Sequence, residues 1–224
     1  MIKVILVDDH KMFREGLKFA LSQMEGIEVI GEASDGNQFL EVIKEKKPDV
    51  VLMDISMPKM DGVEATQNAL QIDPEIKIIT LSMFSDAEYY QKMVAAGTKG
   101  FLVKETGVDE LYKAIQLVHE GGTYFSQQLL QNIIVNISNP VVKGSRNKVV
   151  ELTRREEEVL ELICKGYSNK EVADSLFISQ KTVEGHKSNL MDKTNTKSAI
   201  NLMLFAIKNQ LIDPASLLLK GNPS

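Results

Sequence analysis

Five polar residues that could together carry out phosphoryl chemistry stand at the ends of short apolar segments. Asp8 and Asp9 follow IKVILV, Asp54 ends VVLMD, and Ser82 and Lys104 end two later segments. If these segments are parallel strands, their carboxyl ends share one edge of a sheet, which is where open α/β folds bind ligands. Each residue alone also fits a simpler interpretation, a solvated strand end in a turn.

Taken together, the five residues indicate a metal-assisted site. Neighbouring carboxylates at Asp8, Asp9 and Asp54 repel one another, so a compensating cation is required. Mg²⁺ keeps several waters and suits a site with few carboxylates, so the sequence predicts Mg²⁺ here. Lys104 and Ser82 remain, and they suit a phosphoryl group on Asp54, whose oxygens the metal and the ammonium would neutralise. The glycine-rich phosphate-binding motifs G-x-G-x-x-G and G-x-x-x-x-G-K-[ST] are absent. The adjacent acids Asp8 and Asp9 also lack the D-x-D spacing of phosphatases that use an aspartyl nucleophile.

Strand-like and helix-like segments alternate through the first half of the chain. We expect strands at 2–7, 27–33, 49–54, 76–82 and 99–103, and helices at 10–24, 36–47, 63–72, 87–97 and 108–121. Asp35 is the expected N-cap of the second helix, and Gly97 the expected stop of the fourth. The alternation predicts a flavodoxin-like, doubly wound (βα)5 domain over residues 1–122.

The composition of the 224 residues is that of a globular protein without membrane spans. Hydrophobic residues make up 43% and charged residues 25%, and Cys164 is the only cysteine, which excludes an internal disulfide. The N-terminus lacks signal-peptide anatomy, and the apolar run 202–207 is too short to cross a bilayer, so we expect a cytoplasmic protein. Residues 1–122 carry a net charge of −8 and residues 123–224 one of +3, which suggests two modules with different partners.

The second half is expected to be helical. Residues 123–150 form a polar linker with a short helix, residues 151–214 a four-helix domain and residues 215–224 a tail. The expected N-caps are Thr153, Ser168, Ser179 and either Thr196 or Ser198, and the first two begin S/T-x-x-E capping boxes. Only FIS separates the second helix from the third, which is typical of a helix-turn-helix.

The third helix, 180–194, has one face suited to the DNA major groove. Val183, Leu190 and Thr194 are expected to face inward, with Lys187 extending its ammonium outward. The opposite face is small, polar and cationic, and it carries Lys181, Gly185 and Ser188, flanked by Glu184 and Asn189. A solvated polar face is the alternative.

The motifs of the first half resemble those of a bacterial receiver domain. They are DDH at 8–10, D-x-x-M-P-x-M-D-G at 54–62, Ser82 and GFLVK at 100–104. The resemblance implies that a sensor histidine kinase phosphorylates Asp54. It also implies that the backbone carbonyl of Ser56 joins the three carboxylates around Mg²⁺, and that Ser82 and Phe101 form a switch. Glu105 replaces the proline that often follows the lysine in this family, which leaves the geometry of the Lys104–Glu105 peptide open.

The helical half resembles the LuxR-type helix-turn-helix, and the whole chain a NarL/FixJ-type response regulator. The segment LTRREEEVLELICKGYSNKEVADSLFISQKTVEGHKSNL carries the signatures. The resemblance implies contacts with double-stranded DNA, and the candidates are Lys181, Thr182, Glu184, Gly185, Ser188 and Asn189, with Lys170, Lys187 and Lys193 as phosphate neutralisers. The apolar last helix, with Leu202, Phe205 and Ala206, is expected to form a homodimer on phosphorylation, and RNA polymerase is a further candidate partner.

We therefore predict a phosphorylation-gated transcription regulator that is not an enzyme. One alternative is a phosphatase or phosphotransferase with a helical interaction module, but no additional acid or base accompanies Asp54. Another is a regulator that binds DNA constitutively and uses its first domain for docking, but such a protein need not retain the complete set of site residues.

Overall fold

The computed structural model describes residues 1–83, 87–125, 150–196 and 198–212. The chain divides into two compact units, Met1–His119 and Glu120–Ser224. The short helix expected within 123–150 and the tail at 215–224 lie outside the described residues.

A parallel sheet forms the centre of the first unit. Its strands are β1 (Ile2–Val7), β2 (Ile27–Ala33), β3 (Val50–Asp54), β4 (Ile78–Ser82) and β5 (Gly100–Val103). The strand order is β2-β1-β3-β4-β5-β6, in which β6 (Tyr124–Phe125) is a two-residue strand that the sequence did not predict. The order reverses direction at β1, so β1 and β3 lie beside each other and their carboxyl ends form the edge at which doubly wound sheets bind ligands.

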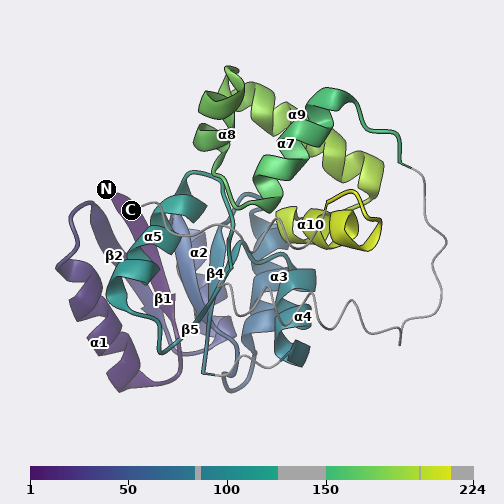
Figure 1. Ribbon diagram of the computed structural model, residues 1–224. Coiled ribbons are helices and arrows are strands. Elements are labelled where there is room, and N and C mark those ends of the chain that lie inside the picture. The colour runs from purple at the N-terminus through teal and green to yellow at the C-terminus, as the bar shows by residue number, and fades with distance from the viewer. Residues whose placement is uncertain (84–86, 126–149, 197, 213–224) are drawn as a thin grey trace. The chain divides into compact units, whose positions relative to one another are not determined.

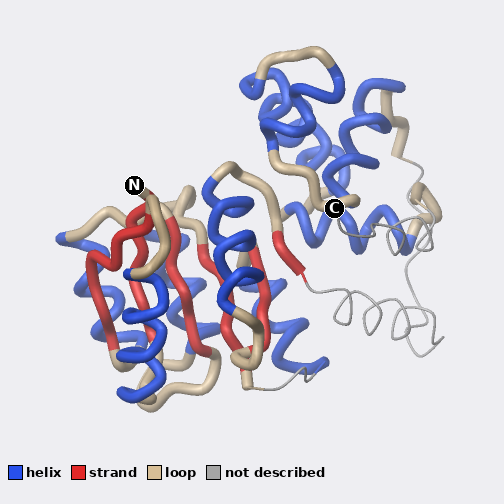
Figure 2. The backbone as a smooth tube through the Cα atoms, turned by 60° about the vertical axis from the view of Figure 1, so that its left-hand side comes forward, coloured by secondary structure: helices blue, strands red, loops and turns tan. Residues whose placement is uncertain are grey.

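Five helices cover the sheet on both faces. They are α1 (Lys11–Ser22), α2 (Gly36–Glu45), α3 (Gly62–Ile72), α4 (Ala87–Ala96) and α5 (Val108–His119). Helices α1 and α5 lie on one face, and α2, α3 and α4 on the other (Figures 1 and 2). The predicted cap is confirmed, because the Asp35 side chain accepts a hydrogen bond from the backbone of Gln38 at 2.9 Å.

The middle strands are buried on both sides, which explains their continuous apolar sequences. Every residue of β3 and of β4 is buried, and the register places Leu52 beside Leu6 on one side and Ile79 on the other. The packed sheet therefore fixes the positions of its strand ends and of the polar residues at those ends.

The described residues of the second unit form four helices: α7 (Arg154–Cys164), α8 (Asn169–Leu176), α9 (Gln180–Thr194) and α10 (Ala199–Lys208). Both predicted capping boxes are present, and Ser179 caps α9. Ser198, rather than Thr196, caps α10. Val183, Leu190 and Thr194 are buried as the helical periodicity predicted. No described helix has the length and apolarity needed to cross a membrane.

Cys164 lies in the core of this helical unit, and we expect its thiol to be inert in the folded protein. It is 4% exposed, and burial, aided by the nearby Glu161 charge, raises its pKa to about 12. Because the thiolate is the reactive form, a thiol reagent at neutral pH should label Cys164 only after the helical unit unfolds, so the rate of labelling should equal the rate of unfolding. Labelling followed by mass spectrometry, with and without denaturant, checks this, and rapid labelling without denaturant would contradict it.

Candidate functional site

The carboxyl edge of the sheet brings together the side chains that the sequence placed at its strand ends. Asp8 follows β1, Asp54 ends β3, Ser82 ends β4 and Lys104 follows β5, and each of the four is largely buried. The Lys104 ammonium lies 2.6 Å from Asp8 Oδ2 and 3.0 Å from Asp54 Oδ2. One buried cation thus bridges two buried carboxylates.

The electrostatics of Asp54 reflect competing influences. Desolvation, followed by the negative charge of Asp8, raises the pKa of the Asp54 carboxyl. Hydrogen bonding and charge from Lys104, and the Ile55 N–H at 2.8 Å from Oδ1, act in the opposite direction. Asp54 is therefore an acid whose charge depends on a nearby cation.

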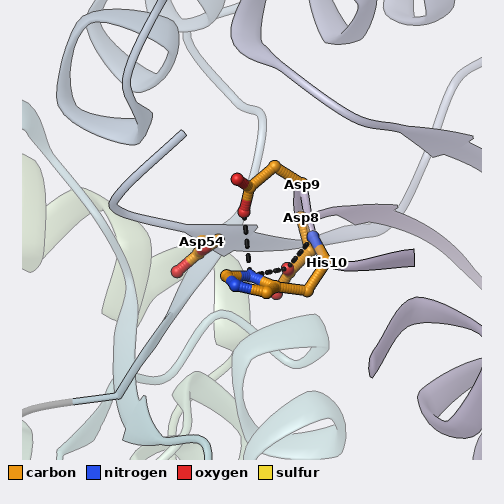
Figure 3. A group of neighbouring side chains, drawn as sticks. All are labelled: Asp8, Asp9, His10 and Asp54. Carbon is orange, nitrogen blue, oxygen red and sulfur yellow. Dashed lines mark hydrogen bonds and ion pairs between the residues drawn. The ribbon is translucent and has the colours of Figure 1, made fainter. Parts of the chain in front are cut away.

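A third acid, Asp9, and a histidine, His10, adjoin this cluster (Figure 3), and both are more exposed to solvent than Asp8 and Asp54. One ligand atom from each of Asp8, Asp9, His10 and Asp54 lies within 4.8 Å of the others. His10 Nδ1 is 2.9 Å from Asp9 Oδ1, and the His10 backbone N–H donates to Asp8 Oδ1 at 2.9 Å. Three carboxylates at this spacing are the hard oxygen ligands that Mg²⁺ prefers, so the residues present fit that ion.

Two residues of α1, Arg14 and Phe13, contact the site and were not predicted from the sequence. Arg14 donates through its guanidinium to the backbone carbonyl of Asp8, and its Nε lies 3.6 Å from Glu32 Oε2 on β2. The Lys104 ammonium lies 4.8 Å from the centre of the Phe13 ring, within cation–π range. The FREG sequence gave no sign of these roles, because they depend on the packing of α1 against the sheet.

The loop from Ile55 to Asp61 leaves β3 and returns to α3 in close contact with its neighbours. Gly62 N donates to the Ile55 carbonyl at 2.8 Å, and Gly36 N donates to the Met60 carbonyl at 3.2 Å. Lys59 has a φ of 66°, and its ammonium lies 2.7 Å from Asp35 Oδ2. The loop that carries Ser56, the predicted carbonyl ligand, is thus anchored to the start of α2.

We expect Asp35→Ala to destabilise the protein by about 1–2 kcal/mol, because it removes the helix cap together with the partner of Lys59. The Lys59 ammonium, with the Gln38 N–H, lowers the Asp35 pKa, so its contribution is present above the ordinary value of 3.8. The difference from wild type should therefore shrink as pH falls below that value. Urea unfolding at several pH values measures this.

Lys59→Gly provides the matched control. It breaks the same ion pair but relieves the left-handed backbone, and the two effects should nearly cancel. A loss as large as that of Asp35→Ala would show that the ion pair, and not the cap, holds the loop.

The remaining predicted residues of the first unit are placed as follows. Lys104 N donates to the Ser82 carbonyl at 2.7 Å, and Phe101 is 1% exposed. The described residues contain no cis peptide bond, so the Lys104–Glu105 peptide is trans.

The outer face of α9 carries the side chains expected to contact DNA. Lys181, Thr182, Glu184, Ser188 and Asn189 are exposed. Gly185 is exposed too, and a Cβ built on it would meet nothing within 4 Å. Lys170 is exposed on α8, whereas Lys187 is half-buried.

Lys193 and the last helix differ from the expectation of free surface groups. The Lys193 ammonium lies 2.7 Å from Glu156 Oε2, inside the first capping box, so it has a structural partner.

The expectation of a dimer surface at Leu202 and Ala206 is wrong for these two side chains, which are 0% exposed. They pack within their own unit, because α10 covers α7 and α9. Phe205 alone of the three is partly exposed.

Family comparisons decide what this pair of units is. Residues 4–116 match the response regulator receiver domain, and residues 150–206 match the bacterial regulatory proteins of the luxR family. The chain belongs to the response regulators. It is a transcription regulator with a receiver domain and a LuxR-type DNA-binding domain, as the sequence predicted.

Relatives of this response regulator align along nearly its whole length. It is 42% identical over 210 residues to the uncharacterized transcriptional regulatory protein YhcZ of Bacillus subtilis, covering 94% of this chain and 97% of the relative. It is 37% identical over 221 residues to the transcriptional regulatory protein DegU of Brevibacillus brevis, covering 93% and 94%. These relatives are regulators, which supports the prediction of a regulator over that of an enzyme.

Two solved structures agree with the fold. The response regulator ChrA of a heme-sensing two-component system is 30% identical with a TM-score of 0.52, and the match covers 94% of this chain and 98% of that one. The receiver domain of NarL from Mycobacterium tuberculosis is 34% identical with a TM-score of 0.52, covering 54% and 97%.

Proposed function

We propose that this response regulator accepts a phosphoryl group on Asp54 from a sensor histidine kinase, and that the modification promotes dimerisation and sequence-specific DNA binding. One observation carries the proposal: the Lys104 ammonium bridges the buried Asp54 and Asp8 carboxylates. A cation held beside a buried nucleophile can follow the charge onto the phosphoryl oxygens once they arrive.

The chemistry required of the chain is simple. An Asp54 carboxylate oxygen attacks phosphorus, the bond from phosphorus to the donor group breaks, and the donor group leaves with that electron pair. Lys104 then pairs with a phosphoryl oxygen and Ser82 donates a hydrogen bond to another. Asp8, Asp9, Asp54 and the Ser56 carbonyl would hold Mg²⁺, which supplies positive charge to the same oxygens.

Phosphorylation would act on the rest of the domain through charge. It adds about −1.5 to −2 at a rim that already holds three carboxylates. Ser82 would turn toward the new oxygens, and Phe101 would rearrange within the core behind it. The β4–β5 side of the receiver would thereby take a second arrangement that favours dimers.

DNA binding is assigned to α9. Its exposed Lys181, Ser188 and Asn189 would enter the major groove, with Gly185 allowing close approach. RcsB, a solved neighbour at 24% identity, has been described in complex with DNA. A regulator that activates a promoter would also contact RNA polymerase.

The test measures DNA affinity and sedimentation of the full-length protein in Mg²⁺, with and without acetyl phosphate. The DNA probe is a duplex that the wild-type protein enriches from a randomised pool. We expect acetyl phosphate to raise both DNA affinity and dimer fraction, and Asp54→Ala to abolish both gains. Glu41→Ala removes an exposed carboxylate whose ion-pair partner in the described part of the chain is Lys44, and it should behave as wild type. Strong DNA binding that ignores acetyl phosphate would leave the receiver as a docking module.

A further inference from the structure

The turn between α8 and α9 presents an aromatic side chain that contributes almost nothing to the fold. Phe177 is 95% exposed, more than any other large hydrophobic residue described. It also has a φ of 55°, in the left-handed region that Gly and Asn adopt most readily. Burial therefore gives the fold little, and the backbone conformation disfavours a phenylalanine at this position.

The backbone that carries the ring is nevertheless well defined. The Phe177 N–H donates to the Asp174 carbonyl at 3.4 Å and the Ile178 N–H to the Ala173 carbonyl at 3.0 Å, a pattern that ends α8 firmly. Two residues later, the Ser179 side chain caps α9. Phe177 thus lies in the turn between the two helices, two residues before the N-cap of α9.

We propose that the Phe177 ring contacts an apolar group of the DNA, a deoxyribose or a thymine methyl, beside the groove that α9 enters. The inference rests on the proposed DNA-binding face of α9 and extends it by one turn. Phe177 lies four residues before Lys181, the first cation of that face, so DNA bound at the start of α9 passes close to the turn that carries the ring.

The charges around Phe177 favour an apolar contact over a phosphate contact. Exposed Asp174 precedes it by three residues, and exposed Glu184 lies on α9. The Asp174 carboxylate, in the last turn of α8, would repel a phosphate beside this turn, whereas a sugar or a base methyl group requires no counter-charge. Phenylalanine is one of the side chains that contact the thymine methyl in the major groove.

The test uses the full-length protein with Mg²⁺ and acetyl phosphate, and the DNA duplex enriched by the wild type. Phe177→Ala and Phe177→Asn should each weaken binding by roughly fivefold to tenfold, as expected for losing part of one buried ring. Phe177→Tyr should retain most of the affinity. Because no phosphate is involved, the dependence of affinity on salt concentration should keep its slope, whereas Lys181→Ala should flatten it.

Stability separates a binding role from a structural one. Phe177→Asn suits the left-handed backbone and should raise the thermal midpoint while affinity falls, and Phe177→Ala should not raise it. A midpoint lowered by Phe177→Asn would make the residue structural and overturn the proposal. If the Phe177 variants bind DNA normally but lose dimers in sedimentation without DNA, the ring contacts a second copy and the proposal also fails.

Two controls identify the partner group and isolate the premise. In a duplex with deoxyuridine in place of thymidine, the gap between wild type and Phe177→Ala closes if the contact is a methyl group, and it persists if the contact is a sugar. If neither Lys181→Ala nor the Phe177 variants affect affinity, the proposed face of α9 is wrong. If only Lys181→Ala does, this inference fails alone.

Discussion

Lys104→Met is expected to destabilise the receiver domain by about 3–5 kcal/mol in the absence of Mg²⁺, and added Mg²⁺ should recover much of the loss. The ammonium is 3% exposed and bridges Asp8 and Asp54, so its removal leaves two buried carboxylates facing each other. Methionine has a similar length and no charge, so the change isolates electrostatics from packing.

The stabilisation by Mg²⁺ should be larger in Lys104→Met than in wild type. In wild type, the lysine already neutralises the cluster, and the ion must compete with it. In the variant, nothing competes, so Mg²⁺ should raise the thermal midpoint more than it does in wild type. Lys113→Met, an exposed lysine on α5, is the control and should show the wild-type response.

The same variant should show a defined pH dependence without Mg²⁺. Burial and Asp8 already raise the Asp54 pKa above its ordinary value of 3.8, and loss of the lysine should raise it more. The folded state then holds a proton that the unfolded state releases, so stability is lost as pH rises through the interval above 3.8. A metal-free stability equal to wild type at neutral pH would contradict the electrostatic account, and so would a loss that Mg²⁺ does not reduce.

The fold was predictable where one physical rule governed a whole segment. Buried parallel strands must be apolar throughout, so VVLMD and its neighbours identified the sheet, and the carboxyl ends of its strands identified the edge. Boundaries were less predictable: β4 begins at Ile78 and not at Ile76, because the Ile76 N–H bonds to the Asp73 carbonyl in a turn. Local hydrogen bonds of this kind leave no periodic signal.

The site was predictable in its members but not in its pairing. Residue types at strand ends indicated which groups gather, but they did not indicate that Lys104 bridges the Asp8 and Asp54 carboxylates when no phosphoryl group is bound. Arg14 and Phe13 were missed because their contacts depend on how α1 turns against the sheet.

The last helix illustrates a limit of hydrophobicity. The apolar character of α10 led to the expectation of a dimer surface, because sequence could not say whether its apolar side chains pack against another molecule or within the same domain. Leu202 and Ala206 pack inside, since a domain of four short helices needs most of its apolar side chains for its own core.

Gly62→Ala is the second large effect that we expect, a destabilisation of about 3 kcal/mol accompanied by slow phosphorylation. A Cβ on Gly62 would lie 2.0 Å from the Asp54 carbonyl oxygen and 3.0 Å from both the Asp54 carbonyl carbon and Ile55 Cα. All three are backbone atoms of a buried segment, so no side-chain rotation can relieve the clash. The chain must instead move the strand end that carries Asp54.

The glycine is required for space and not for backbone freedom, because Gly62 lacks the positive φ of Gly26 or Gly97. Gly16→Ala is therefore a sharp control: Gly16 lies in α1, and a Cβ there would meet nothing within 4 Å, so alanine should stabilise the protein by ~0.5–1 kcal/mol. Urea unfolding and the rate of phosphate incorporation from acetyl phosphate measure both variants. If Gly62→Ala were as stable as wild type but slow to phosphorylate, residues 55–61 would have shifted to relieve the clash while β3 kept its position. Normal stability with normal phosphorylation would mean that the tight contact between α3 and the end of β3 does not hold Asp54 in place.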